Sequence, residues 1–216
     1  MFYMEETEIT VQVFNSFKEI NSILLNQGFK VEGNYLLNDW YFSKLENVKE
    51  ISYLDLLNNS FLVRQVLTDK EKVQLCYKQK ELDEFGNVIK EEKTSTNLDS
   101  LSDTIKIFKK SGLNNYCMVK NNTYIYAKDK IRFCVQVIEN LGIFIEYEED
   151  ETMNNMNAKE KFNYMVSVVN SLKLKLGKDF SCKKVFMLLH KEDEKISCVC
   201  SALNLLNKDY SNVIFN

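Results

Sequence analysis

The stretch Leu141-Gly142-Ile143-Phe144-Ile145-Glu146-Tyr147-Glu148 decides most of what the sequence says about the fold. Within it, apolar side chains alternate with Glu146 and Glu148, which is the period of a strand with one charged face. A second pair, Glu6 and Glu8, lies in an alternating segment near the N-terminus. Side chains two residues apart on a strand lie next to each other on one face. The first and last predicted strands therefore each carry two adjacent carboxylates.

The chain between these two pairs alternates in the same way. We predict six further strands, at about 29–45, 60–67, 72–80, 88–96, 115–127 and 130–139. Two helices are predicted from their starting signals: a capping box at 16–19 opens a helix that ends at Gly28, and 100–103 opens one that ends near Gly112. A third, amphipathic helix is predicted over 156–176, and a helical patch around 180–190. The class is α+β, built on a large antiparallel sheet.

Composition narrows the classes of function. The chain has 216 residues, 45% of them apolar, and a formal net charge of -3 with both signs interspersed. No apolar run approaches the roughly 18 residues of a membrane span, and no basic field of the kind that holds nucleic acid is present. The N-terminus lacks a secretory pattern, so we expect a cytoplasmic location. The six cysteines are expected to be buried thiols. A zinc site on Cys182, His190, Cys198 and Cys200 is the alternative, but its spacing matches no usual zinc motif.

Charged side chains recur at every second position of nearly all the predicted strands. Spacing alone favours a sheet with one face in water, which antiparallel sheets allow. The alternative is a closed or nearly closed barrel of about eight strands whose interior is polar and holds a ligand. The two Glu-x-Glu pairs favour this alternative, because paired carboxylates are what Mg²⁺ or Mn²⁺ binds. On the first interpretation Lys80 is the clearest case of a solvent-exposed strand lysine.

Taken in order, these segments resemble the CYTH superfamily, the triphosphate tunnel metalloenzymes, which include class IV adenylyl cyclases and triphosphatases. The resemblance runs from residue 4 to about 150 and weakens through 190. It rests on seven elements: Glu6-Thr-Glu8-Ile-Thr10, Asp39-Trp-Tyr41-Phe42, Phe61-Leu-Val-Arg64, Leu75-Cys-Tyr77-Lys78, Lys90-Glu91-Glu92, Lys120-Asn-Asn122 and Leu141 to Glu148. It implies a triphosphate tunnel domain over 1–190, with flanking helices and a C-terminal extension, 191–216, of unknown role.

The sequence departs from the family pattern at three site positions. Thr10 replaces a lysine, Asn122 replaces a basic residue, and Gln136 stands where the family has an aspartate. Arg132 has the same strand parity as Gln136, so we expect its guanidinium to replace the cation lost at Asn122.

The resemblance also implies a site. Substrate phosphates are expected to bind Arg64, Lys78, Lys90, Lys120 and Arg132, and Mg²⁺ or Mn²⁺ to bind Glu6, Glu8, Glu146 and Glu148. Glu92, Gln136, Thr10 and Asn122 are expected to line the site, and no catalytic residue is assigned. The expected partner is a nucleoside triphosphate or inorganic triphosphate. No binding to nucleic acid or membrane is expected, and the resemblance is compatible with a homodimer.

Three functions remain open on this resemblance. The leading one is a class IV adenylyl cyclase-like conversion of ATP to cyclic AMP and pyrophosphate. The second is a metal-dependent triphosphatase acting on inorganic, thiamine or nucleoside triphosphate. The third is a non-catalytic member that binds a phosphorylated ligand, which the loss of a carboxylate at Gln136 favours.

Overall fold

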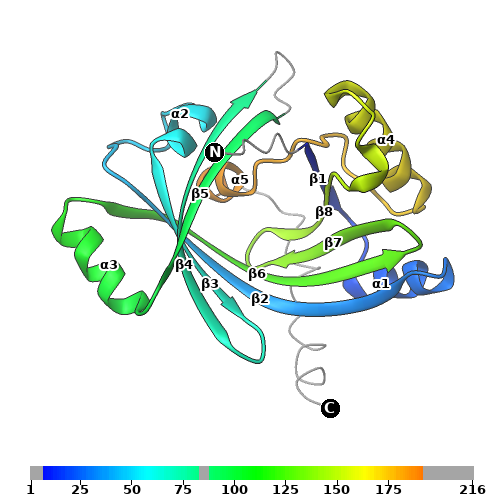
Figure 1. The fold of residues 1–216 in the computed structure, drawn as a ribbon, viewed down its shortest axis with the longest axis horizontal. Coiled ribbons are helices and arrows are strands. Elements are labelled where there is room, and N and C mark those ends of the chain that lie inside the picture. The colour runs from blue at the N-terminus through cyan, green and yellow to red at the C-terminus, as the bar shows by residue number, and fades with distance from the viewer. Residues whose placement is uncertain (1–6, 83–87, 192–216) are drawn as a thin grey trace.

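One antiparallel sheet of eight strands forms the centre of the protein (Figure 1). The structure is a computed structural model that describes residues 7–82 and 88–191. The strands lie in the order β1-β8-β7-β6-β2-β3-β4-β5. Their bounds are β1 (Glu8–Val13), β2 (Lys30–Ser43), β3 (Ser60–Leu67), β4 (Glu71–Leu82), β5 (Val88–Leu98), β6 (Asn114–Lys128), β7 (Ile131–Ile138) and β8 (Gly142–Glu148). The predicted α+β class and the eight strands are therefore confirmed.

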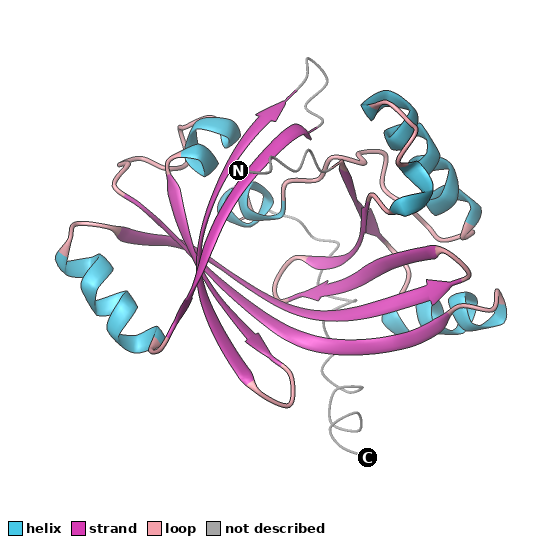
Figure 2. Cartoon of the chain, in the orientation of Figure 1, coloured by secondary structure: helices cyan, strands magenta, loops and turns pink. Residues whose placement is uncertain are grey.

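The helices lie around this sheet (Figure 2). They are α1 (Phe17–Asn26), α2 (Tyr53–Asn58), α3 (Leu101–Lys110), α4 (Ala158–Ser171) and α5 (Lys184–His190), with one 3₁₀ turn, η1 (Glu151–Met153). The predicted capping box opens α1: the Ser16 hydroxyl accepts from the Glu19 amide at 3.3 Å, and the Glu19 carboxylate accepts from the Ser16 amide at 2.8 Å. The sequence did not predict α2. It also extended α4 too far, because the chain beyond Ser171 leaves the helix to run along β1.

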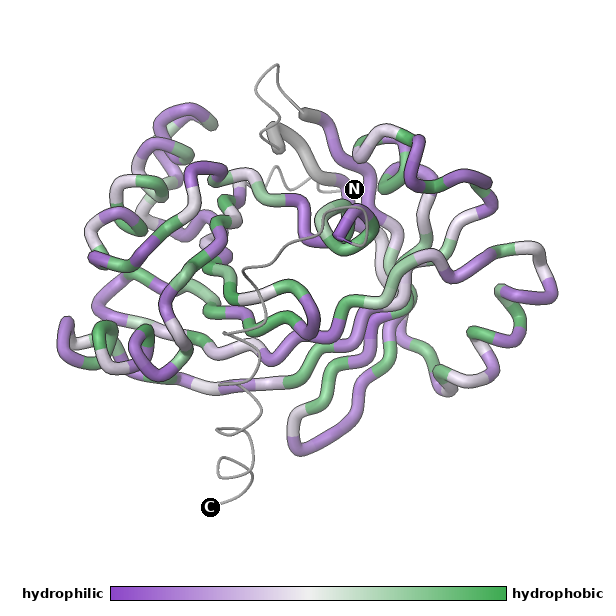
Figure 3. Tube along the Cα trace, turned by 180° about the vertical axis from the view of Figure 1, so that it is seen from behind, coloured by the Kyte–Doolittle hydropathy of each residue, from purple (hydrophilic) through white to green (hydrophobic). Residues whose placement is uncertain are grey.

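The outer face of the sheet carries the apolar core. Helices α1 and α4 cover the β1-β8-β7-β6 half through Ile20, Leu24, Met165 and Val169. Helix α3 covers the other half, where Phe108 lies edge-on to Phe42 at 5.1 Å between ring centres. The alternation of polar and apolar residues that this arrangement requires is visible along the strands in Figure 3.

The inner, concave face is different, because one end of it is covered by α5 (Figure 1). Val185 of α5 packs with Val119 of β6 and Phe144 of β8, while most of the remaining inner face is polar. The helix lies between the β3-β4-β5 side and the β1-β8 side of the curved sheet.

The sheet is not closed into a barrel by strand pairing in the described part of the chain: β1 and β5 are its two ends. The prediction is a closed or nearly closed barrel; the eight-stranded antiparallel sheet is confirmed, and closure by hydrogen bonds between strands is not. The physical reason lies in the outer edge of β1, which already has a partner. The Thr10 amide donates to the Phe180 carbonyl at 2.9 Å, and the Gly177 amide donates to the Gln12 carbonyl at 2.8 Å. The segment 175–182 thus satisfies the edge that a closing strand would need.

No helix in the described ranges is both long and apolar enough to cross a membrane. Of the predicted C-terminal extension, 191–216, all but Lys191 lies outside the described residues, as do Cys198 and Cys200. The structure therefore does not test either the extension or the zinc alternative.

Candidate functional site

A cavity of about 400 Å³ occupies the concave side of the sheet. All eight strands contribute to its lining, together with α2 and the start of α5. The strands do so through alternate residues, such as Tyr35, Leu37, Asp39 and Tyr41 of β2. The alternating polar side chains of separate strands thus meet in one cavity. A sheet with its polar face in water would not bring them together in this way.

The cavity is electrostatically positive, in contrast to the chain as a whole. Four acidic side chains line it (Glu8, Asp39, Glu146, Glu148), against six basic ones (Arg64, Lys78, Lys80, Lys93, Lys183, Lys184). Lys78 of β4 and Lys93 of β5 lie directly opposite each other in the strand register, and both line the cavity. Like charges placed opposite each other across two strands destabilise a sheet unless a counter-charge lies between them. The lining thus has two more basic than acidic side chains.

An ion pair connects β1, one end of the open sheet, to β4, the strand next to the other end. Lys80 Nζ of β4 donates to Glu8 Oε1 of β1 at 2.9 Å, and the Lys80 side chain is 7% exposed. Burial alone would raise the pKa of Glu8, but the positive charges of Lys80 and Lys78 and the Lys80 hydrogen bond lower that pKa to about 2. The interpretation of Lys80 as a solvent-exposed lysine is wrong, because Lys80 lies on the cavity face beside Lys78.

A bidentate pair holds the arginine of β3. Arg64 Nε and Nη2 donate to the two oxygens of Asp39 at 2.8 and 2.7 Å. Burial would lower the pKa of Arg64, but the adjacent Asp39 carboxylate raises it overall, so the guanidinium stays charged. Asp39 lies opposite Arg64 in the β2–β3 register, which explains why the two segments carry them at matching positions.

Helix α5 delivers a third pair to the opposite wall. Lys184 Nζ contacts Glu146 Oε2 of β8 and donates to Gln136 Oε1 of β7 at 2.8 Å, while Gln136 Nε2 donates to Glu146 Oε1 at 3.0 Å. These three side chains form a closed ring of interactions. Gln136 is 3% exposed, so the ring lies in the wall of the cavity and not on the surface.

Lys183, the residue that precedes α5, joins the sheet to α2. Its ammonium lies over the ring of Tyr53 at 5.3 Å from the ring centre. Burial and the nearby positive charge of Lys80 lower the pKa of Lys183, with Glu8 acting in the opposite direction. An anion in the cavity would relieve this repulsion between lysines.

Asn121 of β6 brings an unused polar atom to the cavity. The residue is 6% exposed, and its Oδ1 has no hydrogen-bond partner. A buried polar atom without a partner costs free energy, and such atoms are usually satisfied by water or by a ligand. Asn121 is therefore a candidate acceptor for a donor group on the bound molecule.

A divalent metal does not fit the acidic side chains as they lie. In the described ranges, no group of three or more His, Cys, Asp or Glu side chains comes together as a metal site. Glu8, Asp39 and Glu146 each engage a basic side chain instead. Mg²⁺ and Mn²⁺ need carboxylate oxygens that are available to the ion. The binding of either metal stays a prediction from the resemblance.

The sequence placed thirteen residues in the site, and the structure divides them. Seven line the cavity: Glu8, Thr10, Arg64, Lys78, Gln136, Glu146 and Glu148. Four described side chains lie elsewhere. Lys120 forms an exposed pair with Glu139 at 3.2 Å, and Asn122 donates to the Tyr124 hydroxyl at 2.9 Å. Glu92 pairs in register with the exposed Gln79, away from the Lys78–Lys93 face.

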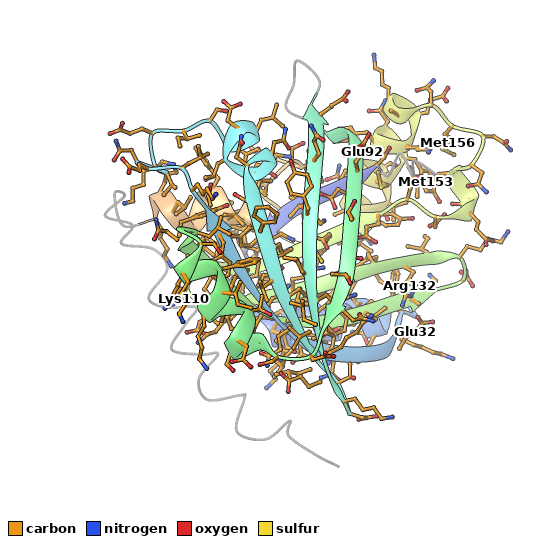
Figure 4. The ribbon with its side chains drawn as sticks, turned by 60° about the vertical axis from the view of Figure 1, so that its left-hand side comes forward. Glu32, Glu92, Lys110, Arg132, Met153 and Met156 are labelled. Carbon is orange, nitrogen blue, oxygen red and sulfur yellow. The ribbon has the colours of Figure 1, made fainter. Side chains whose placement is uncertain are left out.

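Arg132 is the fourth of these side chains. It donates to Glu32 at 3.0 Å and is 60% exposed (Figure 4). It shares its face with Gln136 but lies at the start of β7, so it does not take the role expected for it beside Asn122. Of the two remaining residues, Glu6 lies outside the described residues, and so does the side chain of Lys90.

Six further charged or polar residues of the site were not predicted as site residues: Asp39, Lys80, Lys93, Asn121, Lys183 and Lys184. Lys93 could have been found from strand pairing, since the antiparallel register of β4 and β5 sets it opposite Lys78. Lys183 and Lys184 follow the part of the chain where the family resemblance is clear, and only the three-dimensional return of α5 to the cavity identifies them.

Comparison with known proteins shows which solved structures share this fold. No family model matches the chain, and no curated protein does. Solved structures do match, among them PH1819 protein from Pyrococcus horikoshii OT3 (TM-score 0.64, 16% identity, 86% of this chain and 99% of that one). A "putative adenylate cyclase" from Vibrio parahaemolyticus matches with a TM-score of 0.57 and 14% identity over 87% of this chain and 99% of that one.

A third match is a "putative adenylyl cyclase" from Hippeastrum, described as having a dominant triphosphatase activity. Its TM-score is 0.56 and its identity 14%, over 90% of this chain and 98% of that one. The chain has a CYTH-like fold. At these identities the likeness extends to the fold and not to the reaction, which has to be argued from the cavity.

Proposed function

We propose that this protein binds a triphosphate-bearing anion, inorganic triphosphate or a nucleoside triphosphate, in the central cavity. The observation that carries the proposal is the opposed pair Lys78 and Lys93, which belongs to a lining of six basic and four acidic side chains in a chain of net charge -3. A polyanion bound against the two lysines makes a charge-assisted contact with each of them.

Binding without turnover is the function that the geometry supports best. Phosphoryl transfer is catalysed mainly by positioning and by stabilising charge at the reacting phosphorus. Here Glu8 and Glu146, two of the carboxylates expected to hold a metal, are engaged by lysines, and Gln136 cannot serve as a general base. The cavity retains basic side chains that can bind phosphates, while three of its four acidic side chains are paired with cations.

Turnover of the bound triphosphate is the second candidate. In a triphosphatase, water attacks the terminal phosphorus; in a cyclase, the ribose 3′-hydroxyl attacks the α-phosphorus and pyrophosphate leaves. Three tyrosines, Tyr35, Tyr41 and Tyr53, are among the lining residues, and aromatic side chains in the lining favour a nucleotide over inorganic triphosphate. The Hippeastrum protein of similar fold supports hydrolysis over cyclisation.

Calorimetry with inorganic triphosphate, ATP and orthophosphate tests the proposal. We expect triphosphate and ATP to bind at least about tenfold more tightly than orthophosphate, because more charge-assisted contacts form. Lys78→Gln should weaken binding about tenfold. Lys120→Gln is the matched control, since Lys120 is also a strand lysine but lies outside the cavity. Equal effects of the two substitutions would refute the proposal.

Incubation of the same protein with ATP or inorganic triphosphate, with and without Mg²⁺ or Mn²⁺, separates the candidates. Binding without product supports the first candidate. Orthophosphate identifies a triphosphatase, and cyclic AMP with pyrophosphate identifies a cyclase.

A further inference from the structure

The ring formed by Lys184, Gln136 and Glu146 uses every polar atom of the glutamine and both oxygens of the glutamate. Glu146 Oε1 accepts from Gln136 Nε2 at 3.0 Å, and Glu146 Oε2 contacts Lys184 Nζ. Gln136 Oε1 accepts from the same ammonium at 2.8 Å. Lys184 therefore has two oxygen partners on adjacent strands, much as a cation held between two ligands would have.

An amide is the side chain that this ring requires at position 136. It donates with one end and accepts with the other, so it joins the carboxylate of Glu146 to the ammonium of Lys184. A carboxylate at this position would only accept and would place two negative charges side by side, an arrangement that calls for a cation of higher charge. Glutamine at position 136, where the family pattern has an aspartate, thus matches the lysine that α5 places at position 184.

Two of the other three described carboxylates of the cavity, Glu8 and Asp39, are likewise paired with cations. Glu8 is engaged by Lys80 at 2.9 Å, and Asp39 by Arg64 in a bidentate pair. The chain's own cations already neutralise each of these acidic groups within the low-dielectric wall, where unpaired charge is costly.

We propose that the Lys184 ammonium takes the place at Glu146 that a divalent cation would otherwise hold, so that this cavity binds triphosphate independently of divalent metal. The inference rests on the proposed binding of triphosphate and adds its cation requirement. Gln136 acts as a positioning residue, because it orients both Lys184 and Glu146. Bound phosphate oxygens then face an ammonium group that is fixed by two protein oxygens.

Calorimetry on the whole wild-type protein tests the inference. Triphosphate binding is measured once in EDTA and once in excess Mg²⁺, and in the second case the free triphosphate concentration is corrected for the magnesium–triphosphate complex. We expect the two dissociation constants to agree within about threefold, since a ligand and an ion that do not share a site have a coupling factor near one. An affinity that rises more than about tenfold with Mg²⁺ overturns the inference and leaves triphosphate binding intact. No binding in either condition overturns the proposed function itself.

Substitutions locate the effect. Lys184→Met should weaken binding in EDTA by about tenfold, as expected for the loss of one charge-assisted contact. Gln136→Glu keeps the size of the side chain but removes the donor to Glu146. In that variant we expect weaker binding in EDTA, a gain in affinity on adding Mg²⁺, and direct binding of Mn²⁺ detectable by electron paramagnetic resonance.

Lys161→Met is the matched control, because Lys161 pairs with Glu149 at 2.8 Å with similar exposure and lies outside the cavity lining. It should leave the affinity for triphosphate unchanged. Should the Gln136→Glu variant behave like the wild type in EDTA and in Mg²⁺, the positioning role of Gln136 is refuted. Thermal denaturation of each variant shows whether it is folded. Where a variant is not folded, the comparison of wild-type affinity in EDTA and in Mg²⁺ still decides the inference.

Discussion

Replacement of Glu8 by glutamine removes the charge that faces Lys80 without changing the size of the side chain. The pair joins the first and seventh strands of the sheet order across the cavity, where the strands do not pair with each other. Burial acts to raise the pKa of Glu8, but the charges of Lys80 and Lys78 lower this pKa from its ordinary value of 4.5 to about 2. At about 1.4 kcal/mol for each pH unit, the pair stabilises the fold by roughly 3 kcal/mol at neutral pH. Leaving Lys80 buried without its carboxylate has a cost of the same order.

We therefore expect Glu8→Gln to lower the free energy of unfolding by roughly 3 kcal/mol at pH 7, or about 6–12 °C in melting temperature for a chain of this length. Because the pKa of Glu8 is lower in the folded state, this stabilisation is fully present above about pH 4.5. It is lost as the pH falls toward 2, so the difference between wild type and variant should shrink to less than about half by pH 3.

Guanidinium denaturation from pH 7 to pH 3 provides the measurement. Glu32→Gln is the control, because Glu32 also pairs with a basic side chain but both partners are at least half exposed. Such a pair contributes less than about 1 kcal/mol. A loss of the same size in both variants, or a Glu8 effect that does not change with pH, would show that the Glu8–Lys80 pair does not stabilise the fold across the cavity.

Three further outcomes are expected from the same geometry. Asp39→Asn should lower the free energy of unfolding by about 3 kcal/mol in denaturant titrations, since Arg64 is then left largely buried without its carboxylate. Lys93→Gln should raise the stability of the ligand-free protein by a few tenths of a kcal/mol, because it relieves the repulsion with Lys78, while weakening triphosphate binding in calorimetry. The thiol of Cys182, whose pKa burial raises to about 11, should react with iodoacetamide at pH 8 at least about tenfold more slowly than free cysteine, as measured by peptide mass spectrometry.

The sequence predicts the sheet well because its signals are local. Alternation defines the strands, and the capping box at Ser16 defines the start of α1. Gly142 follows the same logic: its φ of +127° is rarely adopted by other residues, which accounts for a glycine at the turn into β8. The run of 175–182 along β1 could not be predicted in this way, because its hydrogen bonds join residues about 165 positions apart and leave no periodic pattern.

The site is predicted less completely, and β6 shows the physical reason. Alternation separates a strand into two faces but does not say which face looks inward. On β6 the sequence suggested that Lys120 looks inward with Asn122, since charged side chains line the cavity on other strands. In the structure the neighbouring positions Val119 and Asn121 line the cavity instead.

What assigns the faces of β6 is the layer that covers it. Phe17 of α1 packs on Tyr124 at 4.3 Å between ring centres, and the Tyr126 hydroxyl donates to Asn21 of α1 at 2.8 Å. From Lys120 to Tyr126 the even-numbered residues of β6 therefore belong to the outer face, with Lys120 in the part of the strand beyond the helix. The two tyrosines are a better guide to the inward face than the lysine, because a helix must bury its apolar stripe whereas a lysine is stable on either face. The same reasoning places Asn121, not Lys120, among the residues that a ligand in this cavity would meet.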